Sequence, residues 1–516
     1  WQKESRPAPV AATGVPAPAS APAAAPVPVA RGPGAVPTAP AAAAETRRER
    51  IRVTTDEMIA EIDTQGGDIT LLELRKHKDA TDKDKNFVLL TPFYRYSVQS
   101  GLIGGKLPNH KTVYAATARE VVLPEGKDSI ELRLEAPAVD GVSVAKVLTF
   151  RRGSYLIDIR HELSNGGSTP LAAHAYFQIT RDGKSPPGDN AMMSTFTGVA
   201  LYTEQDKYVK LTFSDIDKGK TPYSKSADNG WVGLVQHYFV TALLPAPREA
   251  REYYTRRISD EFYSAGVILG APTIAPGATG SVSVPLYGGP QEQDKLKAIA
   301  PGLELVVDYG WLTVIAAPLF WVLEYFHAWL GNWGLAIILL TVVIKLIFFP
   351  LSAASYRSMA KMKVVSPKLV KLREQYGDDR ARMNQAMMEL YKTEKINPLG
   401  GCLPIVVQIP VFIALYWVLL AAVELRHAPF YGWIADLAAP DPWYVLPTLM
   451  MGSMIIQTKL NPTPPDPVQA KVMMIMPFAF GVMFYFFPSG LVLYWFVNNI
   501  LSILQQWQIT RMIGTE

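Results

Sequence analysis

The chain has 516 residues, enough for two or three domains, and its 49% hydrophobic content averages two different regions. Up to about Leu305 the sequence is polar and strand-like, whereas long apolar runs dominate beyond Trp311. A net charge of +4 is too small to indicate a nucleic-acid-binding protein, and a single cysteine, Cys402, excludes an internal disulfide framework. The sequence shows no start methionine and no signal peptide.

Residues 1–50 are dominated by Ala, Pro, Val and Gly. Such a segment lacks the large apolar side chains that offset chain entropy, so it predicts an extended, disordered linker. A binding role through its prolines is an alternative, although a plain tether is the simpler interpretation.

Residues 51–300 predict an all-β domain. Apolar and polar residues alternate over Ser129–Glu135 and again over Tyr155–Leu163, the period-two pattern of half-buried strands. Similar runs at 208–213 and 281–287 favour one large antiparallel sandwich. Five histidines are scattered without metal-ligand spacing and predict no catalytic site: His77, His110, His161, His174 and His237.

Residues 311–330 are apolar and rich in tryptophan. They predict either a membrane span or a helix lying in the interface, and only Gly331 and Asn332 separate them from the next apolar run. We interpret residues 311–330 as an interfacial amphipathic helix and 331–351 as the first core transmembrane helix.

Four further spans are expected within residues 402–510, at about 403–423, 443–459, 470–487 and 490–510. The polar segment 352–401 carries ten Lys or Arg against five acids, so the positive-inside rule places it in the cytoplasm together with the tail 511–516. Residues 1–330 then lie on the periplasmic side, and we expect a further transmembrane helix before Trp1.

Segment 352–401 predicts an antiparallel helical hairpin. Its apolar residues recur at helical spacing, with Gly377 as a C-terminal cap and Asp378 or Asp379 as the next N-cap. Two functions are equally compatible with it: a solvated connector, or a docking surface built on flexible methionine side chains. The candidate docking residues are Met359, Met362, Met383 and Met387.

Lys345 lies within the apolar run "LTVVIKLIFFP" of the first core helix. A lysine near a membrane-helix centre costs roughly 2.5–3.5 kcal/mol and usually marks function. Pro350 is only five residues away, so the amine could instead extend to the headgroups. The run taken alone leaves these two readings balanced.

Six motifs resemble one family in order and spacing: "VDYGW" (307–311), "GNWG" (331–334), "SMAKM" (358–362), "NPLGGCLP" (397–404), "VELR.APF" (423–430) and "FPSGLVLYW" (487–495). Together they are similar to the YidC/Oxa/Alb family of membrane protein insertases. "QSGL" (99–102) and "YGGPQEQDKL" (287–296) resemble the large periplasmic domain of its Gram-negative members. The implied fold is a polytopic α-helical membrane protein with five core transmembrane helices, plus an all-β periplasmic β-supersandwich.

The resemblance implies a hydrophilic groove that contains one positive residue. That position matches Lys345, where many members carry arginine; lysine keeps the charge but loses the planar fork that grips a carboxylate. Thr341 lies one helical turn before Lys345. The remaining implied groove residues are Gln408, Tyr494, Trp495, Asn498 and Ser502. Taken singly, each also has a purely structural explanation, such as a hydroxyl bonded to its own backbone.

The implied function is insertion and folding of nascent inner-membrane proteins, alone or with the Sec translocon, in a Gram-negative inner membrane. No covalent chemistry, cofactor, metal or nucleic-acid specificity is expected, so the protein is not expected to be an enzyme. Implied partners are nascent membrane proteins, the ribosome and signal recognition particle machinery, the Sec translocon and the phospholipid bilayer. Two alternatives are a solute transporter or channel, and a membrane-anchored carbohydrate-binding or carbohydrate-modifying protein.

Overall fold

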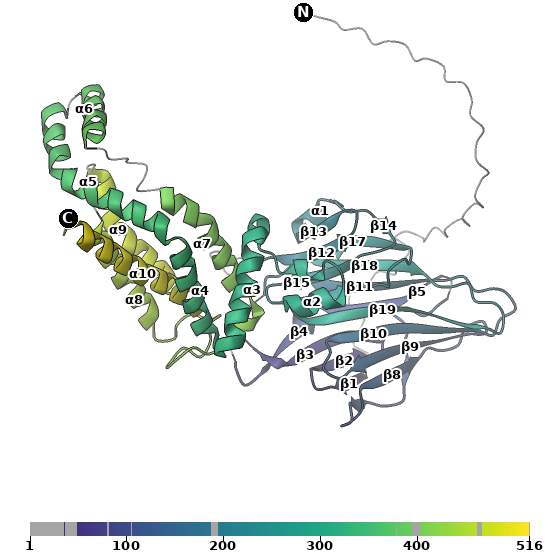
Figure 1. Ribbon diagram of the computed structural model, residues 1–516. Coiled ribbons are helices and arrows are strands. Elements are labelled where there is room, and N and C mark those ends of the chain that lie inside the picture. Colours follow the sequence, from purple (N-terminus) through teal and green to yellow (C-terminus); the bar gives the residue numbers. More distant parts are fainter. Residues whose placement is uncertain are drawn as a thin grey trace, which may run out of the picture.

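The computed structural model describes Val36 and residues 49–79, 82–104, 106–186, 195–377, 379–394, 403–461 and 467–514. Most of the expected linker therefore lies outside the described residues, as do the candidate cap Asp378 and Cys402. Figure 1 shows a β domain beside a helical region, with helix α3 between them.

The β domain consists of two large sheets. The ten-stranded sheet has the order β14 (Ser226–Ala227), β17 (Arg251–Ser259), β18 (Phe262–Gly270), β11 (His174–Asp182), β5 (Ser97–Ile103), β3 (Asp68–Lys78), β2 (Met58–Asp63), β1 (Arg50–Thr54) and β7 (Glu120–Val122), with β4 (Asn86–Leu90) paired to β3. The nine-stranded sheet has the order β13 (Lys207–Leu211), β12 (Thr197–Thr203), β15 (Trp231–Gln236), β16 (Phe239–Leu243), β19 (Thr279–Pro290), β10 (Leu156–Asn165), β9 (Val142–Arg151), β8 (Ser129–Glu135) and β6 (Ala115–Ala116).

Antiparallel pairing dominates both sheets, with a parallel pair between β1 and β7. The expected sandwich is therefore confirmed, and β8 has the bounds that its alternation predicted. In β8 the alternation buries Leu132 and Leu134 against the opposing sheet. In β10 the same alternation carries His161 into the interior, because it occupies an inward position. The sandwich also includes two short helices, α1 (Phe213–Asp217) and α2 (Gln293–Ile299), and the turn η2 (Pro92–Tyr94).

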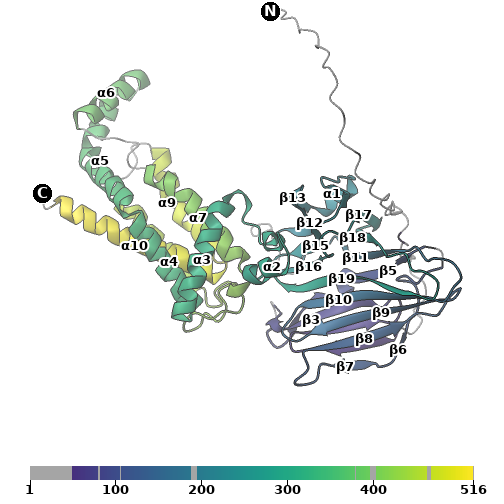
Figure 2. The same ribbon diagram turned by 45° about the vertical axis from the view of Figure 1, so that its right-hand side comes forward.

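The helical region follows the short turns η3 (Leu303–Val306) and η4 (Gly310–Leu312). Its helices are α3 (Thr313–Leu330), α4 (Trp333–Ile347), α5 (Phe349–Tyr376), α6 (Arg380–Thr393), α7 (Leu403–Ala421), α8 (Val445–Leu460), α9 (Pro467–Phe484) and α10 (Ser489–Gly514), with η6 (Val423–Leu425) after α7. Helix α10 packs against α4, α5, α7 and α8, so it is central to the bundle. The hairpin α5–α6 lies at the end of the bundle away from the β domain (Figure 2).

The apolar helices differ in length from the expected spans. Among the described residues, Gly310–Leu330 is the one unbroken helix long and apolar enough to cross a membrane by length and composition, and an interfacial position for residues 311–330 stays a prediction. The first core helix is not a single rod over 331–351: Trp333–Ile347 and Phe349–Met359 meet at a bend of 66°. Pro350 lies in the first turn of α5, where its missing amide is tolerated, so the bend falls directly before it.

The loop that follows α7 joins the two regions. His427 Nε2 donates to the carbonyl oxygen of Lys78, at the end of β3, over 3.2 Å. The guanidinium of Arg426 lies over the rings of Phe87 and Phe239, 5.2 and 5.4 Å from their centroids. The β domain therefore rests against the α7 end of the bundle through hydrogen-bonded and aromatic contacts.

Candidate functional site

Lys345 lies in the last turns of α4 and faces α10. Its side chain is buried, with 6% of the residue exposed, and Nζ donates to Ser502 Oγ over 2.7 Å. Ser502 Oγ donates in turn to the carbonyl oxygen of Asn498 over 2.8 Å. An ammonium has three donors. Among the described residues Ser502 is its one hydrogen-bond partner, so most of its donor capacity stays open to another acceptor.

The sequence around α4 explains this position. Asn332 caps the helix by accepting from the Leu335 amide over 3.1 Å, and the bend before Pro350 ends it at Ile347. Between these ends the helix packs on α3 and α10. Lys345 is thus two residues from the C-terminal end of α4, where the free carbonyl groups of a helix favour a cation.

The other expected polar groove residues are only partly brought together. Ser502 contacts Lys345, and Asn498 is linked to this pair through its backbone carbonyl, which accepts from Ser502. Thr341 is buried one turn away, but its hydroxyl donates to the Ile337 carbonyl of its own helix over 2.7 Å. Gln408 Nε2 instead donates to Ser352 Oγ over 3.2 Å and so links α7 to α5.

Tyr494 and Trp495 are packed within the bundle. The Trp495 ring stacks on Phe412 of α7 with centroids 5.1 Å apart, and the edge of Phe484 meets it at 4.3 Å. The Tyr494 ring lies 5.5 Å from the same Phe412. Both side chains are buried core residues in this structure. A substrate helix would meet them only where these aromatic contacts open.

A polar seam between α8 and α10 was missed by the sequence analysis. Asn499 Nδ2 donates to Ser453 Oγ over 2.7 Å, and Gln457 Nε2 donates to Gln506 Oε1 over 2.8 Å. Ser453 and Gln457 are four residues apart, and Asn499 and Gln506 are seven apart. Each pair therefore shares one helix face, a spacing that was readable from the sequence.

The α5–α6 hairpin matches the expected pair of helices, with Asp379 as the N-cap of α6. Met362 and Met387 pack against Val365 and Leu369 between the helices rather than facing outward. Met359 and Met383 are half-buried. The large apolar side chains that are most exposed on the hairpin are Val364, Val370 and Met388. Docking through the methionines stays a prediction.

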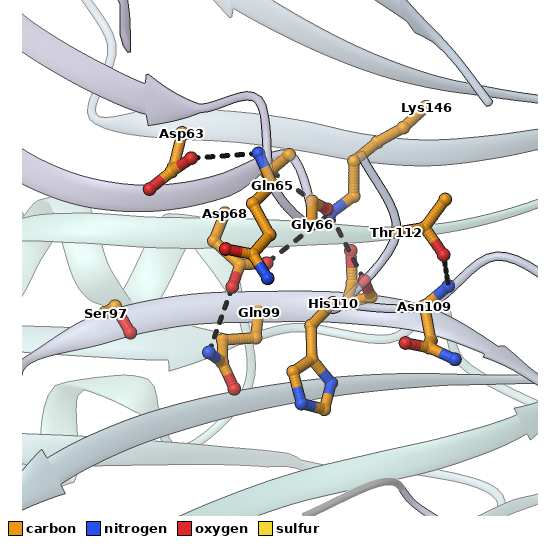
Figure 3. A network of polar contacts seen from close by, with 12 residues as sticks. Asp63, Gln65, Gly66, Asp68, Ser97, Gln99, Asn109, His110, Thr112 and Lys146 are labelled. Carbon is orange, nitrogen blue, oxygen red and sulfur yellow. Dashed lines mark hydrogen bonds and ion pairs between the residues drawn. The ribbon is translucent and has the colours of Figure 1, made fainter. Parts of the chain in front are cut away.

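A second buried cation lies in the β domain (Figure 3). Lys146 of β9 is 1% exposed, and its Nζ donates to the carbonyl oxygens of Gly66, Gly67 and Ser100 over 2.6, 3.1 and 3.2 Å. Asp68 Oδ1 lies 4.0 Å from the same nitrogen. Lys146 therefore ties the β2–β3 turn to β5 across the sandwich.

Two histidines that look unrelated in sequence converge near this lysine. His161 Nε2 lies 3.0 Å from Ser100 Oγ, and His110 Nδ1 lies 2.5 Å from the Tyr176 hydroxyl. Burial lowers the pKa of His110 to about 4 and that of His161 well below its usual value, so both are neutral at pH 7. Burial also lowers the pKa of Lys146.

Lys146 and Ser100 are hydrogen-bonded within this network, whereas His110 Nε2 and His161 Nδ1 are buried without a hydrogen-bond partner among the described residues. Lys146, His110, His161 and Ser100 are all buried, so this cluster is enclosed in the fold. In the part of the chain that the structure describes, no group of three or more His, Cys, Asp or Glu side chains is placed to hold a metal ion. The polar cluster of the β domain therefore supports the fold, whereas Lys345 lies in the helical region with one hydrogen-bond partner among the described residues.

Comparison with known proteins divides the chain at nearly the same place. Residues 50–322 match the family described as YidC periplasmic domain, and residues 325–516 match the family described as 60Kd inner membrane protein. The membrane protein insertase YidC of Aromatoleum aromaticum is 57% identical over 100% of this chain and 95% of its own length. The protein of the same name from Nitrosospira multiformis is 59% identical over 90% of this chain and 82% of its own.

A solved structure is also similar over most of the chain. The crystal structure of an active YidC insertase with its first transmembrane domain resolved covers 90% of this chain and 92% of its own. The two are 17% identical, with a TM-score of 0.41.

Proposed function

This chain belongs to the YidC family of membrane protein insertases, and from that premise we propose that Lys345 is the positive charge with which it receives polar segments of its substrates. As a family member it is an inner-membrane insertase that acts on nascent membrane proteins, and it is not an enzyme. The observation that carries the proposal is the buried Lys345 ammonium, whose one hydrogen bond among the described residues goes to Ser502.

The proposed site is a polar path between α4, α5, α7 and α10. Lys345, Ser502 and Asn498 form one part of it, and Gln408 with Ser352 forms another. Polar side chains at membrane depth are costly unless they face protein or water. Because the bend between α4 and α5 follows Lys345 within three residues, the charge lies at the point where the two helices diverge.

The proposed mechanism needs no covalent step. An acidic or polar tail of a nascent protein enters the path, and the Lys345 ammonium lowers the cost of bringing its carboxylates to membrane depth. The apolar segment that follows then moves sideways into lipid, driven by burial of its apolar surface. The membrane potential adds about 2.3 kcal/mol per negative charge per 100 mV when the tail moves outward.

We also propose the orientation in the membrane. The α5–α6 hairpin is placed in the cytoplasm because basic residues outnumber acids in it, and the β domain is placed in the periplasm. Their positions at opposite ends of the bundle support this arrangement (Figure 1). Contacts of the hairpin with the ribosome and signal recognition particle machinery, and of the bundle with the Sec translocon, are further parts of the proposal.

The test compares insertion by the full-length protein in liposomes, using a small single-span substrate with an acidic translocated tail. Lys345→Ala should lower insertion at least about tenfold, and Lys345→Arg should restore it because the charge is kept. Lys361→Ala is the matched control, since Lys361 is an exposed lysine one helix further on.

A second substrate makes the result specific. The same substrate, with the carboxylates of its translocated tail changed to amides, should depend much less on Lys345 for insertion, because the proposed attraction acts on negative charge. If Lys345→Ala inserts the acidic substrate as well as wild type, Lys345 has no role as a receptor and the proposal fails.

A further inference from the structure

One residue of the Ala- and Pro-rich N-terminal segment is packed against the β domain. Val36, in the sequence Gly34-Ala35-Val36-Pro37, is 1% exposed. It forms one apolar cluster with Ile103 of β5, Tyr176 of β11, Tyr254 of β17 and Ile268 of β18. The expectation of a plain tether does not explain a buried side chain at this position.

The cluster lies on the outer face of the ten-stranded sheet. On β11 the neighbours of Tyr176, Ala175 and Phe177, belong to the sandwich core, and Val267 and Leu269 beside Ile268 do so as well. Side chains alternate between the two faces of a strand. Tyr176 and Ile268 therefore face away from the sandwich core, toward Val36.

The side chains of Ile103, Tyr176, Tyr254 and Ile268 surround Val36, and we call the site that they form the hollow. Polar contacts hold its walls in place. Arg256 Nη1 donates to the Val36 carbonyl oxygen over 3.2 Å, and its guanidinium lies 5.6 Å from the centre of the Tyr254 ring. The Tyr254 hydroxyl donates to Gln178 Oε1 over 2.9 Å, while the Tyr176 hydroxyl meets His110. Both tyrosine walls are thus fixed by hydrogen bonds.

The support of these walls continues into the buried polar network. Gln178 Nε2 donates to Gln99 Oε1 over 2.8 Å, and Gln99 Nε2 donates to Asp68 Oδ2 over 2.9 Å. Figure 3 shows Gln99, Asp68 and His110 close together. The hydrogen bonds through Gln178, Gln99 and Asp68 therefore hold the tyrosine walls in place before a segment binds. Such preorganisation lowers the entropy cost of binding.

We propose that this hollow is a peptide-binding site for a short segment with a β-branched aliphatic residue before proline, and that its occupant is Val36 of the chain's own N-terminal segment. The backbone of a residue that precedes proline is already restricted, so less conformational freedom is lost on docking. Aromatic walls that receive proline-containing segments are a recurring mode of recognition. Arg256 adds direction by binding the carbonyl group of Val36.

Val36 is covalently connected to the β domain, and this connection favours the proposed docking even if the contact between Val36 and the hollow buries little surface. Val36 is 14 residues before Arg50, where β1 begins. A flexible connection of this length gives an effective concentration on the order of millimolar. The docked residue becomes a second point at which the N-terminal segment is attached to the β domain.

The first test measures cysteine accessibility in the full-length protein with Cys402→Ser as background. The sequence also contains Val15-Pro16, which supplies a matched control. Maleimide should modify Val36→Cys about tenfold more slowly than Val15→Cys, because the docked side chain is covered. Equal modification rates would overturn the proposal.

The second test asks whether the residues of the hollow protect the cysteine at position 36 from maleimide. Arg256→Ala or Tyr254→Ala, each in a chain whose β domain keeps its unfolding temperature, should bring the Val36→Cys rate within about twofold of the control. Arg257→Ala, at the neighbouring exposed arginine, should leave the protection unchanged. Protection that survives both hollow substitutions would place the cover elsewhere and refute the site.

A third readout uses the peptide RGPGAVPTAP (residues 31–40) as a labelled probe. It should bind the Val36→Asp protein with a Kd of about 0.1 mM or below, since tenfold protection at an effective concentration of about 1 mM requires that affinity. Binding to wild type should be several-fold weaker because Val36 competes. No binding to the Val36→Asp protein would contradict the proposal.

Discussion

Lys146 of the β domain and Lys345 of the helical bundle are both buried, yet their ammonium groups have different surroundings. Lys146 donates to three backbone carbonyl oxygens and has a carboxylate at 4.0 Å. Lys345 donates to one hydroxyl, on Ser502, among the described residues. Burial is therefore common to both lysines, and the number of hydrogen-bond partners among the described residues is what differs between them.

The difference follows from what each region must do. A buried charge with all its donors used holds surrounding segments in one arrangement, and its loss leaves several polar groups unpaired. A buried charge with unused donors costs more to keep, and we propose that a substrate supplies the missing acceptors of Lys345. The four predictions below test this contrast between the two regions, in order of expected effect.

Lys146→Met should lower the free energy of unfolding of the β domain by about 3–5 kcal/mol, because three carbonyl groups and Asp68 lose their cation. Lys345→Met should change bundle stability by less than about 1 kcal/mol, since only one hydrogen bond is lost. Denaturant unfolding followed by hydrogen exchange of peptides from each region measures both effects in one protein. Equal losses in the two regions would remove the contrast.

The β domain should also lose stability in mild acid through His110. The unfolded chain binds a proton near pH 6.5, whereas burial holds the pKa of His110 at about 4 in the folded domain. The unfolded state therefore binds more protons between these values, so the free energy of unfolding falls as pH falls from about 6.5 to about 4, by up to about 3 kcal/mol.

The variant His110→Asn isolates the contribution of His110 to the pH dependence of the free energy of unfolding. Its stability should depend less steeply on pH over the same window, as measured by denaturant midpoints at several pH values. An unchanged slope would mean that His110 is not the titrating group. The Lys345 region supplies no comparable histidine contact, so the acid effect should appear in the β domain first.

A smaller effect is expected at the α7–α8 loop of the bundle. Asp441 is buried and accepts hydrogen bonds from the amides of Trp443 and Leu446, over 2.9 and 2.7 Å, at the start of α8. Asp441→Ala should destabilise this end of the bundle by about 2 kcal/mol, because hydrogen bonds to a charged group are lost. Faster hydrogen exchange confined to the first turn of α8 would confirm it, and unchanged exchange there would contradict it.

The smallest effect should come from Ser502→Ala. This change removes the hydroxyl that Lys345 contacts but keeps the charge. Insertion of an acidic-tail substrate should stay within about tenfold of wild type, since one hydrogen bond contributes about 1 kcal/mol. A loss as large as that of Lys345→Ala would mean that the serine, rather than the charge, is essential for the site.

Local sequence patterns were sufficient to predict many of the strands and helices. The alternation in Ser129–Glu135 predicted β8 with its bounds, and the apolar runs predicted α7 to α10 within a few residues at most ends. Gly377 and Asp379 marked the turn between α5 and α6. Such patterns depend on near neighbours in sequence, which is why they are readable without the fold.

The arrangement of the polar residues was decided by packing between distant segments. Lys146, Asp68 and His110 are far apart in sequence and meet only because β3, β5 and β9 approach across the sandwich. Lys345 and Ser502 were singled out from the sequence and do meet, because α4 packs on α10. Tyr494 and Trp495, expected to line a groove, are instead covered by Phe412 and Phe484.

The sequence therefore determined the two regions, their strands and helices, the family and the unusual lysine at position 345. Only the tertiary structure decided which buried charge has its partners, which aromatic rings are covered, and that Val36 lies against Tyr176 and Tyr254. The reason is physical: periodicity is a property of neighbouring residues, whereas hydrogen-bond satisfaction and burial depend on contacts between residues far apart in the chain.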